Sequence, residues 1–162
     1  MKIVTTGLMG FGPDKIVPCG KWGNRPITAT VGDQTCRFRS EFEYRWAKWL
    51  QRLYYAGGML SWQYEPRRFE FPDELTGAKV YTPDFLVVEP SGERTWHECK
   101  GRLVGSDVTK FRRMAKYYPA ERLVLVMLRI PTRGEAARRL AHCRKYVAGV
   151  IDGGAILRKV GL

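Results

Sequence analysis

Two acidic residues and a lysine lie in two apolar stretches that a short turn joins. Asp84 directly follows Pro83 in the first stretch, and Glu98 and Lys100 lie in the second, with one residue between them. Two carboxylates with room for a cation between them make a site of hard oxygen ligands. Mg²⁺ binds in this way, through one or two carboxylates together with a substrate phosphate. The residue types therefore indicate a candidate magnesium site.

The turn between the two stretches predicts how these residues face one another. Its sequence is Glu89-Pro90-Ser91-Gly92-Glu93. Proline at the second position of a type I turn, with glycine two residues later, is typical of a three-residue hairpin loop with a bulge. This loop sets Glu89 opposite Glu93, and Asp84 then falls opposite Glu98. Lys100 lies two residues beyond Glu98 and projects from the same face of the strand.

A salt cluster on a solvated face is the alternative interpretation, with Lys100 neutralising the acids. Three features favour a binding site instead. Pro83 removes a donor from the strand ladder, so backbone can open toward a ligand there. Gly101 permits close approach of a phosphate. Residues 100–145 contain 13 basic residues against three acids.

The elements that must position these residues follow from periodicity. Apolar residues at helical spacing predict a helix that begins at Ser40 and ends at Gly57-Gly58. A second helix, capped by Ser106 or Asp107, runs to about Tyr117. Further strands are predicted at 59–64, 67–71, 80–88, 95–100 and 122–128, a last helix at 133–147 after a Thr132 cap, and a short strand at 155–160. This order predicts an α/β fold with a central mixed sheet flanked by helices. Residues 1–38 are expected to form an irregular or short-stranded N-terminal arm, before a domain over 39–162.

The amino-acid composition indicates which class of molecule the protein binds. The 162 residues include 28 Lys and Arg against 16 Asp and Glu, a formal net charge of +12, which favours a polyanion such as nucleic acid over anionic lipid. There is no apolar run of the ~20 residues that a membrane helix needs, and the Gly- and Pro-rich start does not resemble a signal peptide. The four cysteines form no C-x-x-C pair. We therefore expect reduced thiols, no zinc site and a cytoplasmic location.

Pro83-Asp84 followed by Glu98-Cys99-Lys100 resembles the signature of the PD-(D/E)XK nucleases. The setting is also similar: a preceding helix with Ser40-x-x-Glu43, the hairpin, Lys-Gly, a basic helix and an apolar strand. Residues 40–128 thus resemble the restriction-endonuclease-like αβββαβ core. Within this superfamily the pattern is similar to small phage-type endonucleases and also resembles Holliday-junction resolvase-like and transposon-end nucleases.

The resemblance implies roles for individual residues. Asp84, Glu98 and the backbone carbonyl of Cys99 would bind Mg²⁺, for which Mn²⁺ would substitute. Lys100 would orient or help deprotonate the attacking water and stabilise charge on the phosphate. Glu43 would complete the catalytic acids as a metal ligand, either directly or through a metal-bound water, although Ser40-x-x-Glu43 is also a capping box. Glu65 is a further candidate acid, and the whole site is expected in a solvent-facing cleft. Residues expected to bind nucleic acid are Lys110, Arg113, Arg102 and Lys116.

The resulting hypothesis is a Mg²⁺-dependent endodeoxyribonuclease, phage-derived and acting in the host cytoplasm, that cuts duplex or branched DNA. Symmetric cutting of both strands would favour a homodimer. Two alternatives stay open. The first is a DNA-binding module without cleavage, in which the acids form a structural cluster. The second is an RNA-binding or RNA-processing protein, because charge alone does not distinguish the sugars.

Overall fold

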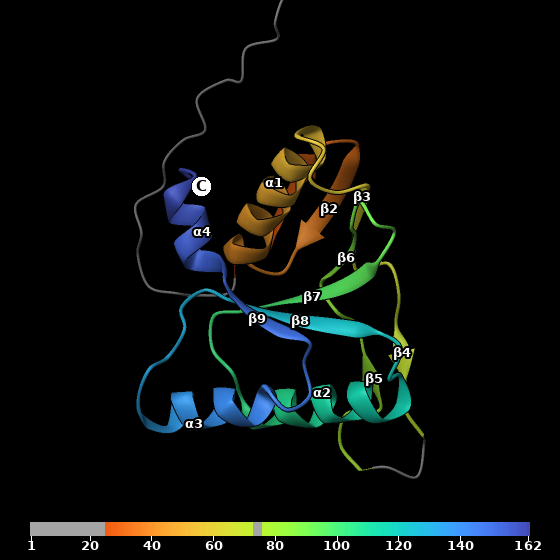
Figure 1. The fold of residues 1–162 in the computed structure, drawn as a ribbon, viewed down its shortest axis with the longest axis vertical. Helices are drawn as coiled ribbons and strands as arrows, with labels where there is room; N and C mark the ends of the chain where they lie inside the picture. The colour runs from red at the N-terminus through yellow and green to blue at the C-terminus, as the bar shows by residue number, and fades with distance from the viewer. Residues whose placement is uncertain (1–24, 73–75) are drawn as a thin grey trace, which may run out of the picture.

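A mixed five-stranded sheet forms the centre of the protein (Figure 1). The computed structural model describes residues 25–72 and 76–162. The sheet has the order β3-β6-β7-β8-β9, with antiparallel pairing from β3 to β7 and parallel pairing from β7 to β9. Its strands are β3 (Ser61–Tyr64), β6 (Phe85–Val88), β7 (Arg94–Lys100), β8 (Arg122–Met127) and β9 (Gly149–Asp152). The predicted α/β class with a central mixed sheet is confirmed.

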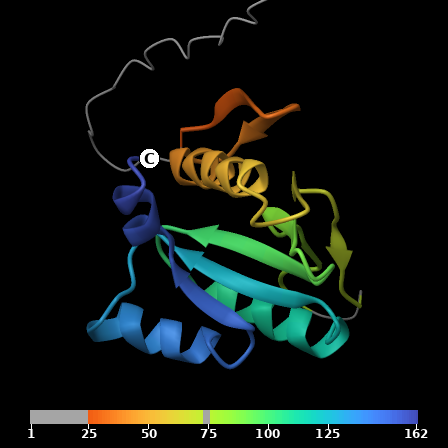
Figure 2. The same cartoon turned by 45° about the horizontal axis from the view of Figure 1, so that its top comes forward.

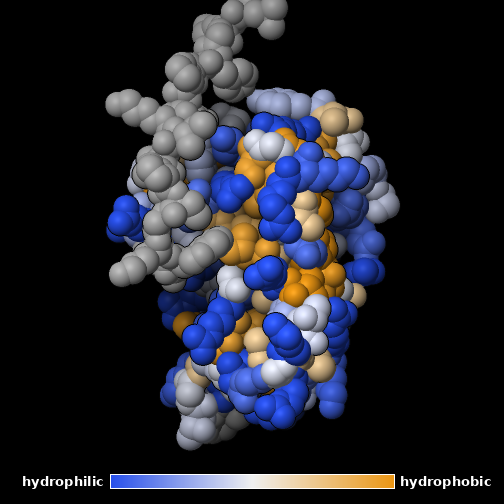
Figure 3. Space-filling view, turned by 90° about the vertical axis from the view of Figure 1, so that its left-hand side faces the viewer, coloured by the Kyte–Doolittle hydropathy of each residue, from blue (hydrophilic) through white to orange (hydrophobic). Residues whose placement is uncertain are grey.

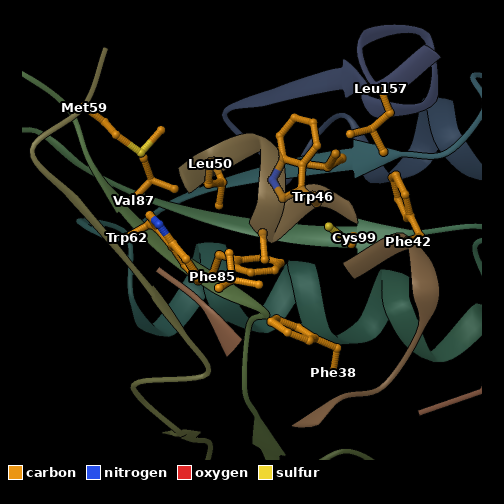
Figure 4. Close-up of a cluster of buried hydrophobic side chains, with 13 residues drawn as sticks. Phe38, Phe42, Trp46, Leu50, Met59, Trp62, Phe85, Val87, Cys99 and Leu157 are labelled. Atoms are coloured by element: carbon orange, nitrogen blue, oxygen red, sulfur yellow. The ribbon is translucent and has the colours of Figure 1, made fainter. Parts of the chain in front are cut away.

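Helices cover both faces of this sheet (Figure 2). On one face lie α1 (Glu41–Tyr55) and α4 (Gly153–Lys159), and on the other lie α2 (Gly105–Tyr117) and α3 (Gly134–Cys143). Because alternate residues of a strand point to opposite faces, β6 contributes to two cores. Phe85 and Val87 pack with α1, as Figure 4 shows, whereas Leu86 packs with the residues under α2.

The N-terminal part of the described chain is a β-hairpin that packs on α1. It consists of β1 (Ile27–Val31) and β2 (Gln34–Phe38), paired antiparallel. Phe38 is fully buried, and its ring contacts those of Tyr44 and Tyr64. The expected N-terminal arm therefore includes paired strands that share the α1 core. Its first part, residues 1–24, lies outside the described residues.

Two predicted strands differ in the structure. The stretch 80–88 divides into β5 (Val80–Tyr81), which pairs with β4 (Phe69–Glu70), and β6. Pro83 lies between them and has no N–H to continue the ladder. The strand predicted at 155–160 is wrong, since α4 occupies this segment. The Asp152 side chain accepts a hydrogen bond from the Ala155 N–H at 2.8 Å and so caps α4 at its N-terminus.

The helix boundaries also differ in part. The predicted start of α1 is confirmed: Ser40 is its N-cap, and its C-cap is Ala56, directly before Gly57-Gly58. At α2 the predicted caps are wrong, because Val104 occupies the N-cap position and Asp107 lies three residues into the helix. The α3 helix is shorter than predicted and ends at Cys143, with Arg133 as its N-cap instead of Thr132.

One side of the molecule carries a band of hydrophobic residues broken up by hydrophilic ones (Figure 3). Within residues 25–72 and 76–162, none of the helices combines the length and the apolar character needed to cross a membrane.

Candidate active site

The hairpin of β6 and β7 brings Asp84 and Glu98 face to face. Phe85 pairs with His97, and Val88 pairs with Arg94. The turn closes as the sequence predicts: the Glu89 N–H donates to the Glu93 carbonyl at 2.9 Å, and Gly92 has a φ of 83°. The predicted register is therefore confirmed. Asp84 and Glu98 each lie one residue beyond the Phe85–His97 pair.

Asp84 is a buried carboxylate with both oxygens engaged. It is only 2% exposed. Its Oδ2 accepts the Cys99 N–H at 2.7 Å, and its Oδ1 lies 2.7 Å from Nη2 of Arg39. Burial, Glu98 and Glu43 raise the pKa of Asp84 well above its usual range, against the opposing effect of Arg39. Burial and the neighbouring acids therefore disfavour the charged form of Asp84, and a further cation would favour it.

Glu98 has an oxygen without a partner. The residue is 3% exposed, and its Oε1 lies 2.8 Å from Nζ of Lys100. In the described part of the chain, the buried side-chain polar atoms without a hydrogen-bond partner are Oε2 of Glu98 and the hydroxyl of Tyr81. Burial, the charges of Glu98 and Asp84, and a side-chain hydrogen-bond interaction with Glu98 raise the pKa of that hydroxyl. A buried carboxylate oxygen without a partner is costly, and either the neighbouring Tyr81 hydroxyl or a cation could satisfy it.

Lys100 lies between two carboxylates. Besides its contact with Glu98, its Nζ lies 3.3 Å from Oδ1 of Asp107 in the first turn of α2. Although burial opposes the charged form, Glu98 and Asp107 raise the pKa of Lys100 above its usual value. The amine is therefore held as an ammonium ion. It suits stabilisation of negative charge and does not suit abstraction of a proton.

Glu43 both caps α1 and adds to the charge of the site. The Glu43 N–H donates to Ser40 Oγ at 3.2 Å, and this hydroxyl donates to Glu43 Oε1 at 2.9 Å. Glu43 Oε2 accepts the Arg39 N–H at 2.9 Å and the Tyr64 hydroxyl at 2.7 Å. The cap therefore exists, with the Arg39 N–H in the place of the expected Ser40 N–H. The same carboxylate contributes to the raised pKa of Asp84.

Sequence reasoning missed Arg39 and Asp107. Arg39 Nη2 lies 2.7 Å from Asp84 Oδ1 and 2.5 Å from Glu65 Oε1. A backbone hydrogen bond also holds Glu65 next to Asp84, because the Glu65 N–H donates to the Asp84 carbonyl at 2.8 Å. The φ of Glu65 is 45°, which lies in the left-handed region. No pattern in the sequence links Arg39 to the hairpin. The position of Asp107, soon after Lys100-Gly101 at the start of a helix, indicates only a cap.

The assembled cluster has an excess of negative charge. Five carboxylates against two cations give a formal charge of −3, within a protein of net charge +12. The expected solvent-facing cleft is wrong, because the central acids are buried behind the Arg39 and Lys100 side chains. The members of the cluster are Glu43, Glu65, Asp84, Glu98 and Asp107, with Arg39 and Lys100.

The donor set fits a hard divalent cation. Its potential ligands are carboxylate oxygens, and Oε2 of Glu98 has no other partner. Over residues 25–72 and 76–162, however, no three His, Cys, Asp or Glu side chains already surround a common metal position. Binding would therefore require side chains to move. Of the two cations in the cluster, Arg39 has the more exposed side chain, at 57% against 23% for Lys100.

The residues expected to bind nucleic acid separate into two groups. Arg102 and Lys116 are exposed, and Lys110 is half-buried, with its Nζ 6.0 Å from the centre of the Tyr81 ring. Arg113 differs: it is 8% exposed and donates to the backbone carbonyls of residues 76 and 78. The assignment of Arg113 to the DNA-binding surface is therefore wrong, because its guanidinium holds a loop.

No protein-family model matches the chain, and no curated protein matches it either.

Proposed function

We propose that this protein is a Mg²⁺-dependent endodeoxyribonuclease with a restriction-endonuclease-like core. The observation that carries the proposal is the cluster of charge −3 with buried central acids, in which Glu98 Oε2 lacks a hydrogen-bond partner and Lys100 is held as an ammonium ion. The order of elements supports it. Leaving aside the small β4–β5 pair, α1, β3, β6, β7, α2 and β8 follow one another as αβββαβ.

In this proposal Asp84, Glu98 and the Cys99 carbonyl hold Mg²⁺. The ion would polarise the phosphate and lower the pKa of a bound water. Lys100 stabilises the negative charge on the phosphate, since Glu98 and Asp107 keep it protonated. Glu43 positions the start of α1 and contributes negative charge next to Asp84.

A cleavage assay tests the proposal. Linear, supercoiled, single-stranded and cruciform DNA are incubated with the protein in Mg²⁺, in Mn²⁺ and in EDTA. We expect cutting in Mg²⁺ and Mn²⁺ that EDTA abolishes. Asp84→Asn, Glu98→Gln and Lys100→Ala should each reduce the rate by about 10²-fold or more. Asp33→Asn, in the turn between β1 and β2, is the matched control and should cut like the wild type.

Circular dichroism must accompany these variants, because the acids are buried. Folded variants that cut at the wild-type rate would refute the proposed site. Cutting that persists in EDTA would refute the metal requirement.

A DNA-binding module without cleavage is the second candidate. The ion pairs Arg39–Asp84 and Lys100–Glu98 favour it, because they neutralise part of the cluster without any metal. Such a module would retard DNA equally in Mg²⁺ and EDTA and cut none of the four substrates. Replacing the DNA with single-stranded and duplex RNA in the same assay tests the RNA alternative.

A further inference from the structure

We propose that Arg39 is a built-in counter-cation of the site, which a divalent metal ion must displace from Asp84 in order to bind. This inference rests on the metal site proposed above. It assigns to Arg39 the role of setting how tightly that metal is held.

The position of the guanidinium is the first observation. Arg39 Nη2 bridges two carboxylates, at 2.7 Å from Asp84 Oδ1 and 2.5 Å from Glu65 Oε1. The other oxygen of Asp84 already accepts the Cys99 N–H. Asp84 therefore has no oxygen that lacks a partner. A metal ion that binds Asp84 shares it with a guanidinium of like charge, and the two repel at this distance.

The second observation is the contrast between Asp84 and Glu98. Glu98 Oε2 is buried without a hydrogen-bond partner and has only the neutral Tyr81 hydroxyl near it, so a cation could bind this oxygen without displacing another cation. The corresponding position on Asp84 is taken by Arg39. Of the two proposed carboxylate ligands, Glu98 can therefore accept a metal ion directly, whereas Asp84 must first lose its contact with Arg39.

The third observation is that the Arg39 side chain has room to move while its backbone is held. Its side chain is 57% exposed, whereas that of Asp84 is 3% exposed. The Arg39 N–H is bound to Glu43 Oε2 at the start of α1. Rotation of the side chain toward solvent would free Asp84 Oδ1 without disturbing the cap.

A metal-binding titration tests this inference without any cleavage. The full-length protein is titrated with Mn²⁺ in the absence of DNA, and free Mn²⁺ is measured by electron paramagnetic resonance. The variants are Arg39→Gln, Arg37→Gln and Glu98→Gln. Arg37 is exposed on β2, two residues before Arg39, so its variant removes the same charge without touching Asp84.

We expect Arg39→Gln to bind Mn²⁺ on the order of tenfold more tightly than Arg37→Gln, which should stay near the wild type. Glu98→Gln should abolish the tight site. Arg39→Lys should fall between the wild type and Arg39→Gln, because one ammonium group replaces a planar guanidinium that bridges two acids. A melting curve gives a second reading: Mn²⁺ should raise the melting temperature of Arg39→Gln more than that of the wild type.

Each other outcome overturns the inference. If Arg39→Gln binds Mn²⁺ no more tightly than Arg37→Gln, Arg39 is a structural ion pair, and the metal site itself still stands. If no variant binds Mn²⁺, or if Glu98→Gln leaves binding intact, the proposed metal site fails and this inference fails with it. If Arg39→Gln does not fold, the Mn²⁺ affinity of Arg39→Lys tests the inference instead. A wild-type Mn²⁺ affinity in Arg39→Lys would refute competition between Arg39 and the metal ion for Asp84.

Discussion

At the scale of the residue, Asp84 experiences opposing forces. Burial, Glu98 and Glu43 favour its protonated form, whereas Arg39 and the Cys99 N–H favour the carboxylate. The net effect is a raised pKa. A metal ion binds the carboxylate form of Asp84, so metal affinity should increase with pH.

The same pKa predicts a pH dependence of stability. The native state holds the Asp84 proton more tightly than the unfolded chain, whose pKa is ~3.9. This contribution to stability is therefore present at low pH and lost as pH rises through the raised pKa. In EDTA, we expect the melting temperature to fall with rising pH and Asp84→Asn to remove part of that fall. Asp33→Asn is the control, and an equal slope in both variants would contradict the prediction.

At the scale of the element, the N-terminus of α1 joins helix capping to the site. Glu43→Gln should keep the cap, since an amide can accept from the Arg39 N–H and donate to Ser40 Oγ. It removes a negative charge next to Asp84, so we expect activity to fall steeply at limiting Mg²⁺ with little change in stability. Ser40→Ala should show the reverse, losing ~1 kcal/mol of stability. Full activity of Glu43→Gln at limiting Mg²⁺ would leave Glu43 with the cap alone.

The α2 helix allows a sharp contrast between two adjacent arginines. Arg113 is buried and donates to two backbone carbonyls, whereas Arg112 is exposed. Arg113→Ala should lower the free energy of unfolding by about 2 kcal/mol, because it removes charged hydrogen bonds from a buried place. Arg112→Ala should change it little. Chemical denaturation measures both, and equal stabilities would show that Arg113 does not hold the loop.

Local signals predict the site only in part. Pro90 and Gly92 define a turn, and the turn determines which residues of the hairpin face each other, so Asp84 and Glu98 can be paired from sequence. Arg39 cannot be placed in this way, because 45 residues separate it from Asp84 and only the packing of α1 on the sheet brings them together. The strand predicted at 155–160 fails for a related reason: the Asp152 cap and the packing against β8 decide for a helix.

At the scale of the whole molecule, a basic protein encloses an acidic site. In the proposed nuclease, the overall charge attracts DNA, and the cluster binds a DNA phosphate through a metal ion. The salt dependence of binding measures the first part. Replacing Arg102, Lys110 and Lys116 together by Gln should flatten the slope of log K against log salt by roughly one unit for each phosphate that the protein no longer neutralises.

A second triple variant controls for total charge. Arg133, Arg144 and Lys145 are exposed near the ends of α3, and their replacement by Gln removes the same three charges. Gel-shift titrations at several salt concentrations compare the two proteins. If both change the slope equally, binding follows net charge, and the α2 surface has no special part in it.

The backbone conformation of Glu65 determines which amino acids residue 65 can be replaced by without loss of stability. Within the described residues, it is the one non-glycine residue with a positive φ, a conformation that costs of order 1–3 kcal/mol and suits Asn or Gly far better. Glu65→Asn should therefore raise the melting temperature although it removes the Arg39–Glu65 ion pair, and a lower melting temperature would refute this. If the proposed site is what keeps a glutamate here, a relative that kept the fold without the site should carry Asn or Gly at this position.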